Sequence, residues 1–254
     1  MNEPNPIPPQ IPPQLPPGAA YGSPRQPGDD PSDRVAIPNP MVAIEAILRQ
    51  PRRLMFQLRQ PGAGRLIAGM VFTAVICAVI YGVVVGTFTG GMQLWAAPVK
   101  IAAGLMISAL ICLPSLYIFT CLSGSQARLV EVCGLLAGLV LLMTLLLIGF
   151  APVAWIFSQS TDSPVWMGTL HLIFWFIATI FGLRFLETGF SHSHARSLAG
   201  FHTWVIIFLL VAVQMTTALR PILGKSETFL PVKKQFFVAH WGECMNSPAP
   251  NTSR

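Results

Sequence analysis

Charged residues are scarce in this sequence. Lysine, arginine, aspartate and glutamate make up 10% of its 254 residues, whereas soluble domains carry roughly 25%. Hydrophobic residues reach 53%. A deficit of charge combined with long apolar runs predicts an integral membrane protein. The net charge of +6 then points to membrane topology and lipid contact, and no nucleic-acid-binding motif accompanies it.

The sequence also lacks the common motifs of catalysis and metal binding. There is no P-loop, GxSxG, HExxH or Rossmann fingerprint, and none of the five cysteines stands in a CxxC pair. The one group of potential ligands is Glu187, His192 and His194, but two histidines two residues apart do not share a helix face. A lipid-modifying enzyme would have to use this group. We therefore predict a non-enzymatic protein without a cofactor or metal site.

Proline is concentrated at the beginning of the chain. More than half of the 23 prolines precede Val42, and the stretch IPPQIPPQLPPG repeats Pro-Pro-Gln with an aliphatic residue. Because proline fixes φ and removes a hydrogen-bond donor, residues 1–40 are predicted to be a disordered or polyproline II tail. The PxxP spacings Pro9/Pro12 and Pro13/Pro16 suit the aromatic groove of a cytosolic protein partner. The plainer interpretation is a solubilising tail.

Residues 41–65, MVAIEAILRQPRRLMFQLRQPGAGR, are basic and amphipathic. Their apolar spacing predicts two short helices broken at Pro51, lying in the membrane surface with the arginines on anionic lipid headgroups. The arginines of this juxtamembrane segment are Arg49, Arg52, Arg53, Arg59 and Arg65. An alternative is that they only orient the first transmembrane helix.

Five apolar runs follow, each near the ~20 residues that cross a bilayer core. They cover residues 66–88, 101–122, 132–157, 165–186 and 201–219. The predicted fold class is therefore an all-α integral membrane protein. Its transmembrane domain, residues 66–222, is a bundle of five transmembrane helices, and residues 223–254 form a C-terminal tail.

The distribution of arginine predicts the orientation. The basic segment before the first span places the N-terminus in the cytoplasm, and five spans place the C-terminus outside, most simply across a bacterial cytoplasmic membrane. Arg220, after the last span, would then lie at the outer interface and contact a lipid headgroup. A purely structural role for Arg220 is to complement the dipole of the helix that Pro221 ends.

Small residues and a proline mark the spans. Glycines four residues apart let helix backbones approach closely, either within the bundle or in a homodimer or a complex with another membrane protein; the predicted packing glycines are Gly82, Gly86, Gly90, Gly134 and Gly138. Pro114 predicts a helix kink. Together with Tyr117 and with His171, an ionisable residue inside the fourth span, it defines the alternative function: a transporter or channel component with a pathway near these residues.

The order of these features resembles a known family. The basic amphipathic approach, the five spans, PSLYIF at 114–119 and LRPILG at 219–224 resemble the uncharacterised bacterial branch of the Yip1-like family of polytopic membrane proteins. The resemblance covers about residues 41–240, and the DLYGP-like motif of eukaryotic members is absent. It implies an interaction or membrane-organising role and no catalytic residues. We therefore expect a membrane scaffold or accessory subunit whose proline-rich tail recruits a cytosolic partner.

Overall fold

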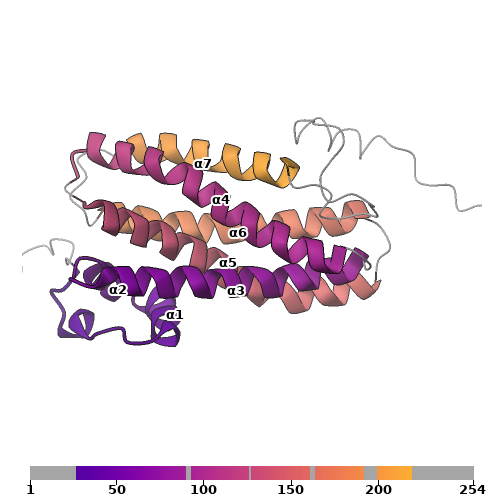
Figure 1. Ribbon diagram of the computed structural model, residues 1–254, viewed down its shortest axis with the longest axis horizontal. Helices are drawn as coiled ribbons and strands as arrows, with labels where there is room; N and C mark the ends of the chain where they lie inside the picture. Colours follow the sequence, from indigo (N-terminus) through magenta and orange to yellow (C-terminus); the bar gives the residue numbers. More distant parts are fainter. Residues whose placement is uncertain (1–26, 90–92, 126, 161–163, 192–198, 219–254) are drawn as a thin grey trace, which may run out of the picture.

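The computed structural model describes residues 27–89, 93–125, 127–160, 164–191 and 199–218. Within these ranges every regular element is a helix (Figure 1), which confirms the all-α prediction for them. The elements are the 3-10 helix η1 (Pro31–Arg34) and the α-helices α1 (Pro40–Arg49), α2 (Pro51–Leu58), α3 (Ala63–Thr89), α4 (Gln93–Leu122), α5 (Leu129–Ser160), α6 (Pro164–Ser191) and α7 (Ala199–Ala218).

Four of these helices, α3 to α6, are long and apolar enough to cross a membrane. The fifth predicted span corresponds to α7, whose apolar part, Gly200–Met215, is shorter than the other four. The structure thus supports an integral membrane protein with four membrane-crossing helices. The predicted count of five is not confirmed.

The second predicted span was placed too late in the chain. The sequence predicts a loop up to Lys100 and a helix from residue 101, but α4 begins at Gln93. Pro98 lies inside this helix, although a proline removes a backbone hydrogen bond. Inside α4 that proline is accommodated by the close approach of Gly82 in α3, and Lys100 becomes part of the helix.

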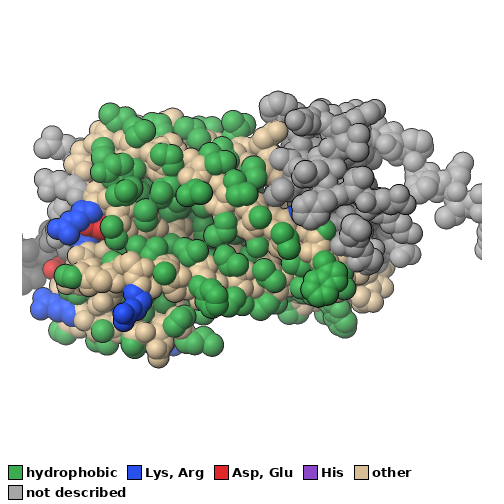
Figure 2. All heavy atoms as spheres, viewed as in Figure 1, with side chains coloured by type: hydrophobic (Ala, Val, Ile, Leu, Met, Phe, Trp, Pro, Cys, Tyr) green, Lys and Arg blue, Asp and Glu red, His purple; other side chains and the backbone are tan. Residues whose placement is uncertain are grey.

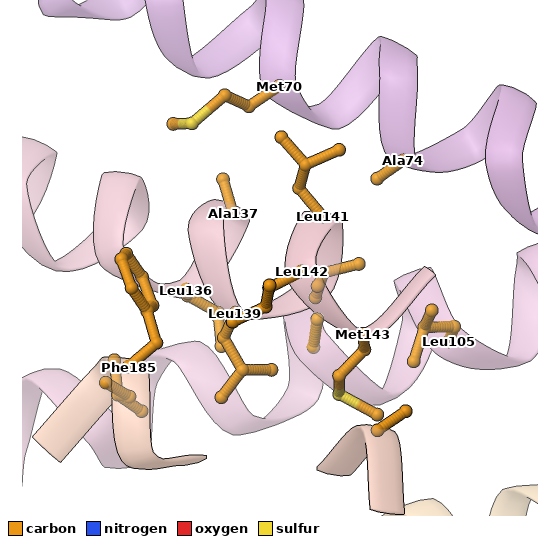
Figure 3. Packing of buried hydrophobic residues seen from close by; sticks show 14 of the residues in the cluster. Met70, Ala74, Leu105, Leu136, Ala137, Leu139, Leu141, Leu142, Met143 and Phe185 are labelled. Atoms are coloured by element: carbon orange, nitrogen blue, oxygen red, sulfur yellow. The ribbon is translucent and has the colours of Figure 1, made fainter. Parts of the chain in front are cut away.

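Helix α5 occupies the centre of the bundle. It packs against α3 on one side and α6 on the other, while α4 covers α3 and α7 lies along α4 (Figure 1). Every residue from Gly134 to Thr144 is buried. In Figure 3, Leu141 points from α5 toward Met70 and Ala74 of α3. An apolar sequence on all sides of a helix is what such a central position requires.

The chain enters the bundle through α1 and α2, which we call the collar. Pro51 begins α2 and ends α1 at Arg49, because the residue before a proline avoids helical geometry; the predicted break at Pro51 is confirmed. The apolar residues of the collar turn toward the bundle. Ile47, Leu54 and Leu58 are buried members of the main hydrophobic core.

The residues that precede the collar fold against it. Residues 27–36 lie against α2 and contain η1, so the predicted boundary of the disordered tail at residue 40 lies too late in the chain. Asp30 caps η1 by accepting a hydrogen bond from the Ser32 backbone N–H, and Pro31 takes the first helical position, which proline favours. The helix-start signal of DDPSDR was hidden among the prolines. Residues 1–26 lie outside the described residues.

Candidate functional surfaces and buried polar residues

Charge is gathered at one end of the bundle, where α3 and α5 begin and α4 and α6 end. We call it the arginine-rich end and its opposite the far end. Figure 2 shows blue side chains at the left of the visible face and green, hydrophobic side chains over most of the remaining described surface. Arg128 and Arg184 join the collar arginines at this end, and both are exposed. Among the described residues, Lys100 alone carries a charge near the far end.

The predicted headgroup arginines have different surroundings. Arg52 and Arg65 are exposed, and so is Arg49, whose guanidinium lies 3.7 Å from the Glu45 carboxylate. Arg59 is half-buried, with Nε 3.8 Å from Oε2 of Glu131 at the start of α5. Such partly exposed ion pairs contribute little to stability. Arg220 lies outside the described residues.

Arg53 is engaged by the chain itself. Its Nε donates to the Val35 carbonyl and its Nη2 to the Ala36 carbonyl, both at 2.9 Å. The side-chain amide of Gln57, one turn along α2, adds a 3.3 Å bond to the Val35 carbonyl. The planar fork of the guanidinium suits two neighbouring carbonyls. Arg53 therefore fastens residues 35 and 36 to α2.

Two further hydrogen bonds join Gly28 to Asp33 and Arg34, just before the residues that Arg53 holds. The Asp33 carboxylate accepts a bond from the Gly28 backbone N–H, 3.1 Å away, and Arg34 donates to the Gly28 carbonyl at 3.0 Å. Gly28 has φ +98°, a conformation that L side chains rarely adopt. It also packs so closely on Phe56 that a Cβ would lie 2.6 Å from the ring. Residues 27–36 thus form a compact turn on the outer side of α2.

Glycines sit at the tightest helix contacts. A Cβ at Gly82 would overlap the backbone of Pro98 in α4, one at Gly134 would overlap Leu58 of the collar, and one at Gly138 would lie 2.6 Å from the Phe185 ring of α6. Gly86 is buried. Gly90 lies outside the described residues.

Two close-contact glycines escaped the sequence analysis. Gly182 of α6 would place a Cβ 2.9 Å from Met143, and Gly189 would place one 2.5 Å from Leu135. Both face α5. They are seven residues apart and have no glycine four residues away, so the four-residue spacing that revealed the others was absent.

Pro114 lies inside α4 and is exposed. Nearby, the Cys112 carbonyl accepts two side-chain bonds: one from Trp204 Nε1 of α7 at 3.0 Å and one from Ser115 Oγ at 2.9 Å. Trp204 itself is fully buried. The indole N–H therefore ties α7 to α4 at a backbone group, which explains why a tryptophan can be buried there without leaving its donor unpaired.

The polar contact between α3 and α6 joins Tyr81 and His171. The Tyr81 hydroxyl is 2.7 Å from His171 Nδ1, and the two rings meet edge to face at an interplanar angle of 85°. The other ring nitrogen, Nε2, is buried and has no hydrogen-bond partner among the described residues. Phe174 adds an edge-to-face contact on the same helix.

The predicted group of Pro114, Tyr117 and His171 does not form a single site. Tyr81 adjoins Gly82, and Gly82 packs on Pro98, so His171 lies at the level of Pro98 near the far end. At 1.5 Å per residue, Tyr117 lies about 28 Å further along α4 and Pro114 about 24 Å further. The three residues therefore lie at different levels of the bundle, and a pathway that passes near them stays a prediction.

One hollow lies at the arginine-rich end, between α2, α5 and α6. Its walls combine the Arg59–Glu131 pair with apolar groups of the collar and the bundle. The lining residues are Met55, Leu58, Arg59, Ala127, Glu131, Leu135 and Gly189.

Comparison with known proteins does not assign a family: no family model, no curated protein and no solved structure matches the chain. The Yip1-like resemblance therefore stays a prediction. Within the described ranges, no three histidine, cysteine or acidic residues gather as metal ligands; His192 and His194 lie outside those ranges.

Proposed function

We propose that this chain is a non-enzymatic polytopic membrane protein that acts as a scaffold or accessory subunit and presents its proline-rich tail to a cytosolic partner. The attachment of residues 27–36 to α2 carries this proposal. Because Arg53 holds residues 35 and 36, the tail leaves the bundle from a fixed place at the arginine-rich end. A tail anchored there stays next to the membrane, where a recruited partner would be needed.

Lipid contact is the second part of the proposal. The exposed guanidinium groups of Arg49, Arg52 and Arg65 are available to anionic headgroups, each contributing about 1 kcal/mol near a charged surface. Arg128 and Arg184 extend this set at the same end. By the positive-inside rule this end would face the cytoplasm.

The proposal includes α7 as a fifth span and places the C-terminus outside. With 20 residues, α7 is about 30 Å long, which equals the thickness of a bilayer core. Its register with α4, fixed by the bond from Trp204 to the Cys112 carbonyl, runs it from the arginine-rich end toward the far end. Arg220 would then reach the outer headgroups.

A membrane-protein partner or a second copy of the chain would contact α7. Gln214 is exposed on this helix, and the register with α4 places it roughly 10 Å inside the level of Trp95. An amide in contact with acyl chains is costly, whereas an amide between helices forms hydrogen bonds. This observation favours another helix beside α7 at that depth.

Topology is tested by labelling Cys244 with a membrane-impermeant thiol reagent in intact cells, after the other four cysteines are replaced. Labelling before lysis is expected for five spans with the C-terminus outside. Labelling only after lysis would contradict this orientation.

Recruitment is tested with a photo-crosslinking amino acid at Leu15. The wild-type tail should give one discrete adduct with a cytosolic protein, and replacing Pro9, Pro12, Pro13 and Pro16 by alanine should abolish it while membrane insertion is unchanged. An adduct that survives these substitutions, or no adduct at all, would remove the basis for a recruiting tail.

A second candidate function is movement of a proton or small polar ligand through the bundle. The buried, unpartnered Nε2 of His171 favours it, because intramembrane ionisable groups commonly serve such pathways. The purified protein in vesicles with an internal pH-sensitive dye provides the test. A proton flux that H171F abolishes would support this candidate, and equal flux in wild type, H171F and empty vesicles would reject it.

A further inference from the structure

Three tryptophans stand at the far end with their side chains exposed. Trp95 is 79% exposed, Trp155 53% and Trp166 73%. They belong to the beginning of α4, the last turns of α5 and the beginning of α6. Three different helices therefore bring an amphipathic ring to the same end, opposite the arginines. Such rings prefer the boundary between headgroups and acyl chains.

The surface changes character at this level. On α6, the exposed side chains between Trp166 and Arg184 are all apolar: Leu172, Ile173, Phe176, Ile180 and Phe181. The same apolar surface continues over α3, α4 and α5, where the exposed residues between the two ends are aliphatic or aromatic, apart from a glycine, prolines and Cys121.

Polar side chains return beyond the tryptophans. Gln159 and Ser160 are exposed at the end of α5, a turn past Trp155, and Thr87 is exposed near the end of α3. On α3 and α5 the apolar surface, which still includes Ile156 and Phe157, therefore gives way to a polar one within about a turn of the tryptophan level, as it does at a lipid–water boundary.

The length of the apolar band agrees with a bilayer. At 1.5 Å per residue, Trp166 and Arg184 are about 27 Å apart along α6, and Trp155 and Glu131 about 36 Å apart along α5. The Gly82–Pro98 contact places Val85 of α3 at the level of Trp95. Arg65 lies about 30 Å from that level. A hydrocarbon core is about 30 Å thick, and helix tilt accommodates the longer α5.

We propose that Trp95, Trp155 and Trp166 form an interfacial belt that docks the far end of the bundle in the outer headgroup–acyl boundary, with the opposite boundary at the level of Arg65 and Arg184. The partner is a lipid bilayer, since its thickness and its polarity profile match the band. The inference deepens the proposed function, because it rests on the helices crossing a membrane. It also places Tyr81 and His171 about 5–8 Å inside the outer boundary.

Quenching by brominated phosphatidylcholine in reconstituted vesicles tests the belt. Each of three variants retains one belt tryptophan together with Trp204, and the remaining tryptophans are changed to phenylalanine. Bromines near the headgroup end of the acyl chain should quench each belt tryptophan more strongly than bromines near the chain terminus. A variant that retains only Trp204, which is fully buried, is the matched control and should be quenched by neither lipid.

The unmodified protein provides a measurement that needs no substitution. Its total tryptophan emission should also lose more intensity with the shallow bromines than with the deep ones. Equal or deeper quenching in both the single-belt variants and the wild type would overturn the proposed boundary, and so would an absence of quenching. Adduct formation at Leu15 is measured separately, so a wrong belt position and a failure of tail recruitment give different results.

Discussion

The hydroxyl of Tyr81 and Nδ1 of His171 lie 2.7 Å apart and join α3 to α6. Ninety residues separate the two side chains in the sequence, so no local pattern indicates the pair. Both helices are apolar around it, and Tyr81 is 4% exposed. A hydrogen bond in such surroundings has no water to replace it. It is therefore a specific point of attachment between two membrane-crossing helices.

Tyr81→Phe is predicted to destabilise the bundle. The substitution removes the hydroxyl and leaves both nitrogens of His171 without a partner among the described residues. A buried polar group that loses its partner costs about 1–3 kcal/mol. The free energy of unfolding, measured by SDS titration in mixed micelles, should fall by that amount.

Tyr117→Phe is the matched control for this experiment. Tyr117 is half-buried and lies toward the arginine-rich end of α4, so its hydroxyl is not part of the α3–α6 contact. Its removal should change stability by less than half as much as Tyr81→Phe. Equal losses in the two variants would mean that the Tyr81 hydroxyl contributes nothing specific.

Gly82→Ala is predicted to be harmful although alanine is the better helix former. A Cβ at this position would overlap the Pro98 backbone, which cannot rotate away as a side chain can. Overpacking of this kind typically costs about 1–3 kcal/mol. Thermal unfolding in detergent should therefore occur at a lower temperature than in the wild type.

Gly149→Ala tests whether the close approach, rather than glycine itself, decides the outcome. No atom lies within 4 Å of a Cβ built at Gly149 in α5. Alanine in a helix interior is favoured over glycine by roughly 0.5–1 kcal/mol. This variant should be unchanged or slightly more stable, and a loss as large as that of Gly82→Ala would contradict the packing argument.

Much of the fold could be predicted because the apolar runs are long and because proline is a strong signal for the end of a helix. The break at Pro51 followed from proline geometry. Errors arose where local signals conflicted with tertiary contacts. Residues 93–100 were predicted to form a loop, but they belong to α4, where Gly82 of α3 gives Pro98 room. The DDPSDR turn was assigned to a disordered tail, because the bonds that fasten the next two residues, Val35 and Ala36, come from Arg53, 18 and 17 residues later.

The candidate sites were less predictable than the fold. Glycines spaced by four residues were found, whereas Gly182 and Gly189 became visible only through Met143 and Leu135 of α5. The sequence also does not indicate which tryptophans are exposed. Trp95 is 79% exposed and Trp204 is fully buried, and composition does not distinguish them. The assembled bundle decides which residues of two helices contact each other. It also decides which side of a helix meets lipid.

Trp204→Phe is predicted to loosen α7 from α4. The substitution removes the donor to the Cys112 carbonyl, a loss of about 0.5–1.5 kcal/mol, and the smaller ring weakens packing on Phe208, which stacks 5.2 Å from the indole. Amide hydrogen exchange should accelerate in α7 more than in α5. Trp175→Phe on α6, a half-buried position, should leave exchange in α7 unchanged; equal acceleration in both variants would refute a specific α4–α7 attachment.

Arg53→Gln is predicted to release residues 27–36 from the collar. The bonds from the guanidinium to the Val35 and Ala36 carbonyls would be lost, and bonds to charged donors contribute about 1.5–3 kcal/mol. If cleavage follows local opening, trypsin should cut after Arg34 roughly 10- to 100-fold faster.

Arg52→Gln removes the same charge from an exposed neighbour and should leave the cleavage rate at the wild-type value. Arg53→Lys should resemble Arg53→Gln, since one ammonium group lacks the planar fork that bonds both carbonyls. Faster cleavage in Arg52→Gln as well would attribute the effect to charge at the arginine-rich end, and the tail would then have no fixed point of departure from the bundle.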